Sequence, residues 1–247
     1  HPAQIAMDVA SLDEMSGGRL TLGLGAGLAR PIARPGIDNA QTRAALSDGV
    51  AIVRGLLGGE PLTYRGQAFS VEGAKLDVAP LRASLPILLA ADVPDALALS
   101  GDIADGLIVD GLRPAGFAAH AASIARPKRL VHFAPCAVGT DRAAAMAVMK
   151  PVLAALLRQH WQDTQDDPVL RAALVHHSGI PAGDFSIAVA SNEPDERFFE
   201  AFTVTGDAAD CRRRADAFRE AGVTDLAVTF VGPNPIHDMA FLHRAVG

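Results

Sequence analysis

The sequence has few of the features that covalent cross-links or membrane insertion require. Its 247 residues include only two cysteines, Cys136 and Cys211, which excludes a disulfide framework and a multi-cysteine zinc module. No apolar run approaches the length that spans a bilayer, and no signal peptide precedes the first helical pattern. These absences predict a cytoplasmic protein with no membrane partner.

Positive charge is also scarce. The chain has 22 Lys and Arg against 28 Asp and Glu, a net charge of −6. Nucleic acids and anionic membranes attract basic surfaces, so we expect neither as a partner and a small-molecule substrate instead. The 49% hydrophobic content excludes a disordered chain, because that much apolar surface can offset the ordering entropy.

Common catalytic and metal-binding motifs are missing too. The eight histidines include no HExxH and no pair four residues apart, and His176 and His177 would point about 100° apart on a helix. There is no GxSxG elbow and no P-loop. We therefore expect no metal site, Cys136 packed as a small hydrophobe, and Arg212–Arg214 on a solvated helix face.

Short apolar runs alternate with helical patterns along the chain. Strands separated by helices predict βαβ units and a parallel sheet. About five strands are expected, and a small hairpin turns at Gly66. No linker or repeat divides the chain, so residues 1–247 are predicted to form one domain. The expected strands are Leu20–Ala26, Pro86–Ala91, Gly106–Val109, Leu130–Val138 and Leu226–Val231, and the clearest helices are Ala44–Leu57, Ala115–Ala125, Asp141–His160 and Ala208–Glu220.

The most informative segment is the glycine-rich run from Leu20 to Gly27. Side chains alternate along a strand, so its leucines share one face and its glycines the other. The leucine face suits packing against helices, and the glycine face leaves room for a flat ring; an ordinary strand-to-loop turn is the alternative. Leu28 and Arg30 stand where a GxGxxG pattern needs glycine, which excludes a dinucleotide-binding fingerprint.

Two further strand ends are candidate binding sites. Ala90, Ala91 and Asp92 follow a strand and precede a helix that opens at Pro94. Free amides at a helix N-terminus bind anions, although Asp92 could instead cap its own helix. The third candidate is Asp110-Gly111 after the next strand, for which an ordinary turn is the alternative.

A family resemblance begins with Ser16-Gly17-Gly18-Arg19 and the Leu22–Gly27 segment behind it. Together they resemble the bacterial-luciferase-like superfamily, which includes FMN-dependent monooxygenases and deazaflavin (F420)-dependent oxidoreductases. The resemblance covers most of the chain and weakens between about residues 162 and 202. It continues in Leu57–Gly66, Pro86–Asp92, Ala104–Gly106 and Ala221–Asp225.

The resemblance implies a (β/α)8 barrel of the TIM type. Leu20–Ala26 then resembles the fourth strand and Leu226–Val231 the eighth. The chain starts at His1-Pro2, and we expect an incomplete barrel that lacks about its first three strands. Open strand edges favour self-association, so a homo-oligomer, a dimer or larger, is expected.

The resemblance also implies a site. The cofactor ring, from FMN or coenzyme F420, would lie over Gly25, Ala26 and Gly27. Its phosphate would lie near Ala90, Ala91 and Asp92, and near Asp110 and Gly111. Leu28 stands where some deazaflavin enzymes carry a glutamate proton donor, and Val93 where a glycine often follows. Tetrahydromethanopterin-type and sugar-phosphate-type chemistry is therefore less favoured than a generic flavin role, and the catalytic residues stay unknown.

The predicted function is a luciferase-like flavin- or F420-dependent oxidoreductase or monooxygenase acting on a small organic substrate. In such enzymes the cofactor carries the redox chemistry and the protein positions it. The alternative is a non-catalytic scaffold or binding protein that kept a barrel remnant. An unrelated β/α enzyme, such as an aldolase, is a third reading, but no predicted strand end carries the reactive lysine it would need.

Overall fold

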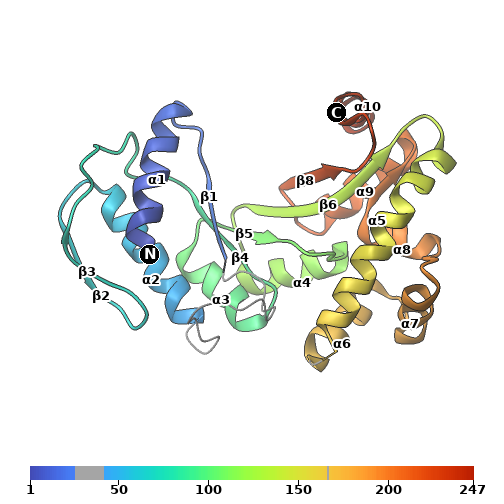
Figure 1. Ribbon diagram of the computed structural model, residues 1–247, viewed down its shortest axis with the longest axis horizontal. Coiled ribbons are helices and arrows are strands. Elements are labelled where there is room, and N and C mark those ends of the chain that lie inside the picture. Colours follow the sequence, from blue (N-terminus) through green and yellow to red (C-terminus); the bar gives the residue numbers. More distant parts are fainter. Residues whose placement is uncertain (26–41, 166) are drawn as a thin grey trace. The chain divides into compact units, whose positions relative to one another are not determined.

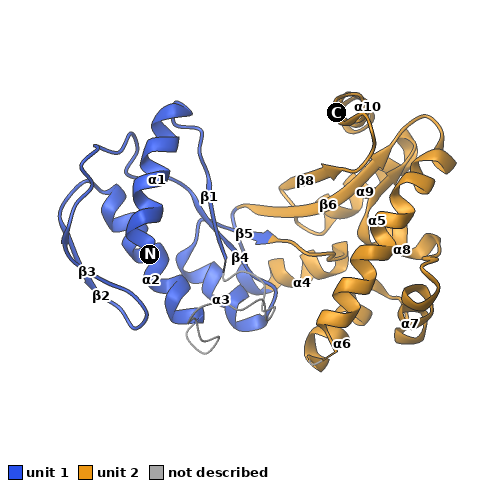
Figure 2. Ribbon diagram, in the orientation of Figure 1, with its two compact units in different colours: residues 1–108, 124–128 blue, residues 109–123, 129–247 orange. Residues whose placement is uncertain are grey.

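The computed structural model describes residues 1–25, 42–165 and 167–247 (Figure 1). They form two compact units (Figure 2). Unit 1 comprises His1–Ile108 and Ile124–Lys128, and unit 2 comprises Val109–Ser123 and Arg129–Gly247. Whether both belong to one domain over residues 1–247 stays a prediction.

Unit 1 contains a parallel sheet in which β4 lies between β1 and β5. Strand β1 pairs with β4 from Leu22 opposite Ile87 to Gly25 opposite Ala90. The antiparallel hairpin of β2 and β3 confirms the turn expected at Gly66. The elements are α1 (Pro2–Met15), β1 (Leu22–Gly25), α2 (Thr42–Leu57), β2 (Leu62–Arg65), β3 (Ser70–Ala74), β4 (Ile87–Ala90), α3 (Pro94–Ile103) and β5 (Gly106–Val109).

Helix α2 supplies much of the core of unit 1. Its apolar residues recur at helical spacing, and Leu46, Val50, Val53 and Leu57 are all buried, as the pattern predicts. The leucines of β1 pack against this core. The sheet thus turns its leucine face toward the helices.

The Ser16–Arg19 motif forms the turn between α1, which the sequence did not lead us to expect, and β1. Gly17 and Gly18 have φ of +64° and +78°, a region that side chains disfavour. The buried carboxylate of Asp13 accepts hydrogen bonds from the Leu20 amide at 3.2 Å and from Arg82 Nε at 2.8 Å. The Ser16–Arg19 turn, together with the Asp13 contacts, therefore fixes the direction in which β1 leaves α1.

Unit 2 is built around the long strand β6, which pairs in parallel with both β7 and β8. Strand β7 was not expected from the sequence, and residues 168–202, where the family resemblance is weak, form the three helices α6, α7 and α8. The elements are α4 (Ala115–Ala125), β6 (Leu130–Val138), α5 (Arg142–Asp163), α6 (Pro168–Ser178), α7 (Ala182–Ser191), α8 (Glu196–Phe202), β7 (Val204–Gly206), α9 (Ala208–Glu220), β8 (Asp225–Phe230) and α10 (Pro235–Val246).

Helix α9 confirms one prediction from the sequence and contradicts another. Its bounds are those expected from Ala208–Glu220, and Asp207 caps it in a capping box with Asp210. Arg212 and Arg213 are exposed, but Arg214 is half-buried with its guanidinium 5.3 Å from the centre of the Phe218 ring. The solvated face therefore does not include Arg214, whose pKa is lowered by burial. Cys136 is buried, as predicted.

Candidate functional site

Strand β1 presents a face almost without side chains. Leu22 and Leu24 are half-buried and Gly23 and Gly25 are exposed, which confirms the predicted alternation. Strand register places Leu88 opposite Gly23, and Ala90 opposite Gly25. Ile108 of β5 is the register partner of Ala90. These five residues, Gly23, Gly25, Leu88, Ala90 and Ile108, form what we call the glycine platform.

The glycine platform depends on small residues. A Cβ at Gly23 would lie 2.8 Å from Cδ1 of Ile108, so even alanine there would force that side chain to move. Leu88 is buried and Ile108 half-buried. The platform is therefore a low, apolar surface in which the tip of Ile108 reaches toward Gly23 and both glycines stay exposed, which suits a planar ring.

The end of β4 leads into α3 through Ala91 and Asp92. The Ala91 amide donates to the Ile108 carbonyl at 3.2 Å, which ties this turn to β5. Val93, and not Asp92, occupies the N-cap position of α3, and its side chain makes no capping bond. Amides in a first helical turn lack intrahelical partners. The side chain of Val93 does not accept a hydrogen bond from those of α3.

Arg43 is a candidate site residue that sequence reasoning missed. It is exposed in the first turn of α2, and its Nη1 donates to the backbone carbonyl of Asp95 at 3.0 Å. This contact brings a cation to the N-terminal turn of α3, where Asp95 itself adds an exposed carboxylate. The two residues are 52 positions apart, so no local pattern could have linked them.

The candidates Asp110 and Gly111 belong to unit 2. Gly111 has φ of +75°, and its amide donates to Oδ1 of Asp110 at 2.7 Å. A Cβ at Gly111 would lie 3.2 Å from Cε1 of His160. The turn is thus closed on itself by Asp110, which occupies the amide that an anion would otherwise bind.

The structure brings some of the predicted site residues together. Gly25 and Ala90 are register partners, and Ala91 and Asp92 continue from Ala90. Ala26, Gly27, Leu28 and Arg30 lie outside the described residues. Within residues 1–25, 42–165 and 167–247, no group of three or more His, Cys, Asp or Glu side chains is placed to hold a metal ion, and no helix there is long and apolar enough to cross a membrane.

Comparison with known proteins gives matches along most of the chain. Residues 1–225 match the family described as luciferase-like monooxygenase. The 5,10-methylenetetrahydromethanopterin reductase of Methanolobus tindarius is 30% identical over 244 residues, which cover 93% of this chain and 73% of the relative. The expected preference for a generic flavin role over tetrahydromethanopterin chemistry finds no support in this match.

Solved structures show the same fold. The coenzyme F420-dependent tetrahydromethanopterin reductase of Methanopyrus kandleri has a TM-score of 0.81 at 21% identity, covering 100% of this chain and 78% of that one. The oxygenating constituent of 3,6-diketocamphane monooxygenase from Pseudomonas putida, in complex with FMN, has a TM-score of 0.67 at 16% identity, covering 98% and 72%. These likenesses confirm the α/β fold class of the luciferase-like barrels, and the relatives are named enzymes.

Proposed function

The chain belongs to the luciferase-like monooxygenase family, and on that premise we propose that it is an F420-dependent oxidoreductase whose cofactor ring lies over the glycine platform. The observation that carries the proposal is the exposed, side-chain-free face of β1 at Gly23 and Gly25. F420 is favoured because the reductase from Methanopyrus kandleri, which shares the fold with the higher TM-score, is named as F420-dependent.

The described residues of unit 1 fit such a group. A planar ring gains by covering apolar surface, and the platform offers the half-buried Ala90 and Ile108 beside the exposed glycines of β1. These side chains would keep water from one face of the ring and fix its height above β1. A larger residue at Gly25 would occupy that space.

The anionic part of the cofactor would bind apart from the glycine platform, at the start of α3. The first-turn amides of α3 and the guanidinium of Arg43 lie together at the carboxyl end of β4, and both favour negative charge. The carboxylates of Asp92 and Asp95 disfavour a bound anion, so we assign its attraction to the α3 amides and to Arg43. Asp110 and Gly111 stay candidates for the same role, with the Gly111 amide first having to leave Asp110.

The bound deazaflavin would supply hydride transfer to or from a small organic substrate. The residues of this chain would bind and orient the ring and shield one of its faces. No described residue is assigned as a proton donor. Methylenetetrahydromethanopterin is the first substrate to test, because a reductase of that name covers 93% of this chain.

Titration of the purified chain with F420 and with FMN, followed by fluorescence, tests the proposal. F420 should bind, and Gly25→Val should weaken that binding more than about tenfold. Gly183→Val is the matched control, because a Cβ at Gly183 in α7 meets nothing within 4 Å. Turnover with the pterin substrate is then followed by the change in F420 absorbance.

The other outcomes are distinct. Tight binding of FMN and not F420 would replace the proposal with an FMN-dependent monooxygenase, as in the Pseudomonas putida relative. Binding of neither would favour the non-catalytic scaffold and refute the proposed function. F420 binding that is unchanged in Gly25→Val would refute the glycine platform as the ring site.

A further inference from the structure

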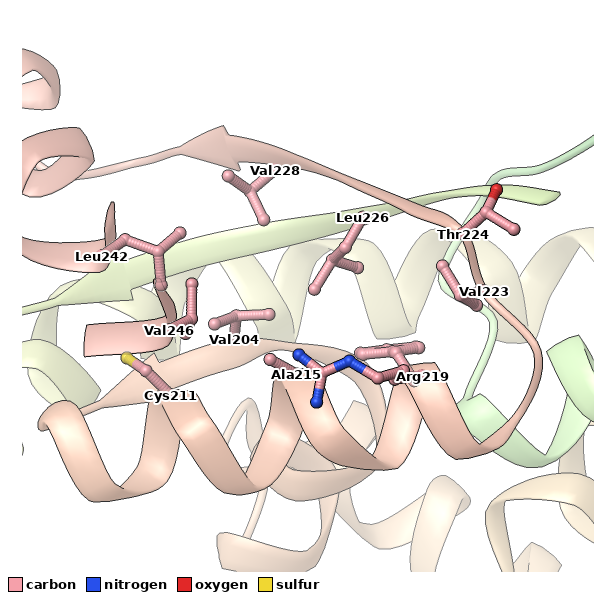
Figure 3. Close-up of a pocket in the computed structure, with 11 residues that line it drawn as sticks. Val204, Cys211, Ala215, Arg219, Val223, Thr224, Leu226, Val228, Leu242 and Val246 are labelled. Carbon is pink, nitrogen blue, oxygen red and sulfur yellow. The ribbon is translucent and has the colours of Figure 1, made fainter. Parts of the chain in front are cut away.

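A cavity of about 200 Å³ lies in unit 2, among residues that the proposed function does not use (Figure 3). Leu226 and Val228 line it from β8, and both point toward α9 in Figure 3. Leu242 and Val246 of α10 close it on another side. The cavity therefore lies in the layer between a strand and two helices, where side chains normally fill the space.

The space exists because α9 carries small residues where it faces this layer. Cys211 and Ala215 are one turn apart and both line the cavity. Phe218 also lines it, but its ring is held against His132, with ring centres 4.5 Å apart. Leu226, Val228, Leu242 and Val246 are only half-buried, although all four are apolar. An apolar occupant would complete their burial.

The chemistry of the lining disfavours a charged group inside the cavity. No carboxylate of the described residues lines the cavity. Burial, with help from Asp210 and Asp207, raises the pKa of the Cys211 thiol to about 11, so it is neutral at physiological pH. An apolar cavity of about 150 Å³ accommodates benzene in a protein core. The space here therefore suits a compact hydrocarbon body, either a short alkyl chain or one aromatic ring.

One cation stands at the rim. Arg219 lines the cavity one turn beyond Ala215, and its side chain extends along α9 toward Ala215 in Figure 3. It pairs with Asp216, but both side chains are more than half exposed. Exposed pairs of this kind are weak, and a ligand carboxylate can share the guanidinium. The hydroxyl of Thr224 is occupied by the Leu130 carbonyl and Asp225.

We propose that this cavity binds a compact amphipathic carboxylate, with its hydrocarbon body between Ala215, Leu226 and Leu242 and its carboxylate at Arg219. The apolar walls and the neutral floor select the body, and the single cation at the rim selects the head group. The site is independent of the glycine platform, so its test needs no cofactor.

Isothermal titration of the chain with octanoate, and with octanol as the neutral counterpart, tests this site. Octanoate should bind about fivefold more tightly than octanol, as expected for one exposed ionic contact. Arg219→Gln should bring octanoate to the level of octanol and leave octanol unchanged. Arg244→Gln is the control, since Arg244 is exposed on α10 and does not line the cavity.

Filling the cavity gives the second measurement. Ala215→Phe should abolish binding of both probes while the protein stays folded, as judged by circular dichroism; Ala215→Leu serves if the phenylalanine variant does not fold. Methyl NMR signals of Leu242 and Val246 should shift when octanoate is added to the wild type. Absence of binding at millimolar octanoate, unchanged binding in the filled variant, or equal affinity for octanoate and octanol would each overturn the proposal.

Discussion

The hairpin of unit 1 is held by one buried carboxylate. Asp48 of α2 is 4% exposed and accepts hydrogen bonds from the Tyr64 hydroxyl at 2.8 Å, the Ala68 amide at 2.7 Å and the Phe69 amide at 3.0 Å. The approach is so close that a Cβ at Gly66 would overlap this carboxylate. We expect replacement of Asp48 to loosen the turn between β2 and β3.

The magnitude follows from these contacts. Asp48→Ala leaves two amides and one hydroxyl without their acceptor, and each buried unsatisfied donor costs about 1–3 kcal/mol. The three hydrogen bonds are only part-buried, so water can reach the freed groups; we therefore take the lower end for each and expect a loss of about 3 kcal/mol in unfolding free energy. Asp48→Asn keeps one acceptor oxygen and should lose about 1–2 kcal/mol.

Urea unfolding at neutral pH measures both variants. Asp102→Ala is the matched control, because Asp102 is exposed on α3, and it should change stability by less than about 0.5 kcal/mol. Wild-type stability of Asp48→Ala would refute the reasoning, since it would mean that the three hydrogen bonds contribute nothing net.

Acid provides an independent test of the same carboxylate. Burial alone would raise the pKa of Asp48, but hydrogen bonds from Phe69, Ala68 and Tyr64 outweigh it and hold this pKa below its usual value. The stabilisation is therefore complete above the unfolded-state pKa of about 3.9 and is lost as the pH falls through the lower folded-state pKa. The stability difference between wild type and Asp48→Asn should shrink in acid; a difference that grows would contradict this assignment.

Three other predictions concern different parts of the molecule. Asp13→Asn should lower the urea midpoint, because Arg82 and the start of β1 lose their shared carboxylate; an unchanged midpoint would contradict this. Burial lowers the pKa of His132 to about 4, so the protein should lose roughly 3 kcal/mol as the pH falls from about 6.5 toward that value. His132→Leu should flatten this profile in denaturant titrations, and an equally steep profile would assign the loss to other groups. Among the described residues β1 pairs only with β4, and an unpaired strand edge favours self-association. Light scattering should therefore show a dimer or a larger oligomer, and a stable monomer would refute this prediction.

Much of the local structure could be predicted from the sequence. The bounds of α4, β6 and α9 agree with those expected from Ala115–Ala125, Leu130–Val138 and Ala208–Glu220, because apolar period and capping residues are properties of neighbouring positions. The two faces of β1 followed from alternation alone. Strand β7 was missed because three residues are too few to show a period.

Contacts between distant positions were decided by the tertiary structure alone. Three features join segments that are separated in the chain: the hydrogen bond from Arg43 to the Asp95 carbonyl, the burial of Asp48 under the hairpin, and the cavity between α9 and α10. A sequence pattern records which residues can be buried. Which of them meet depends on how helices pack over a sheet, and a hydrogen bond or a cavity wall exists only once that packing is in place.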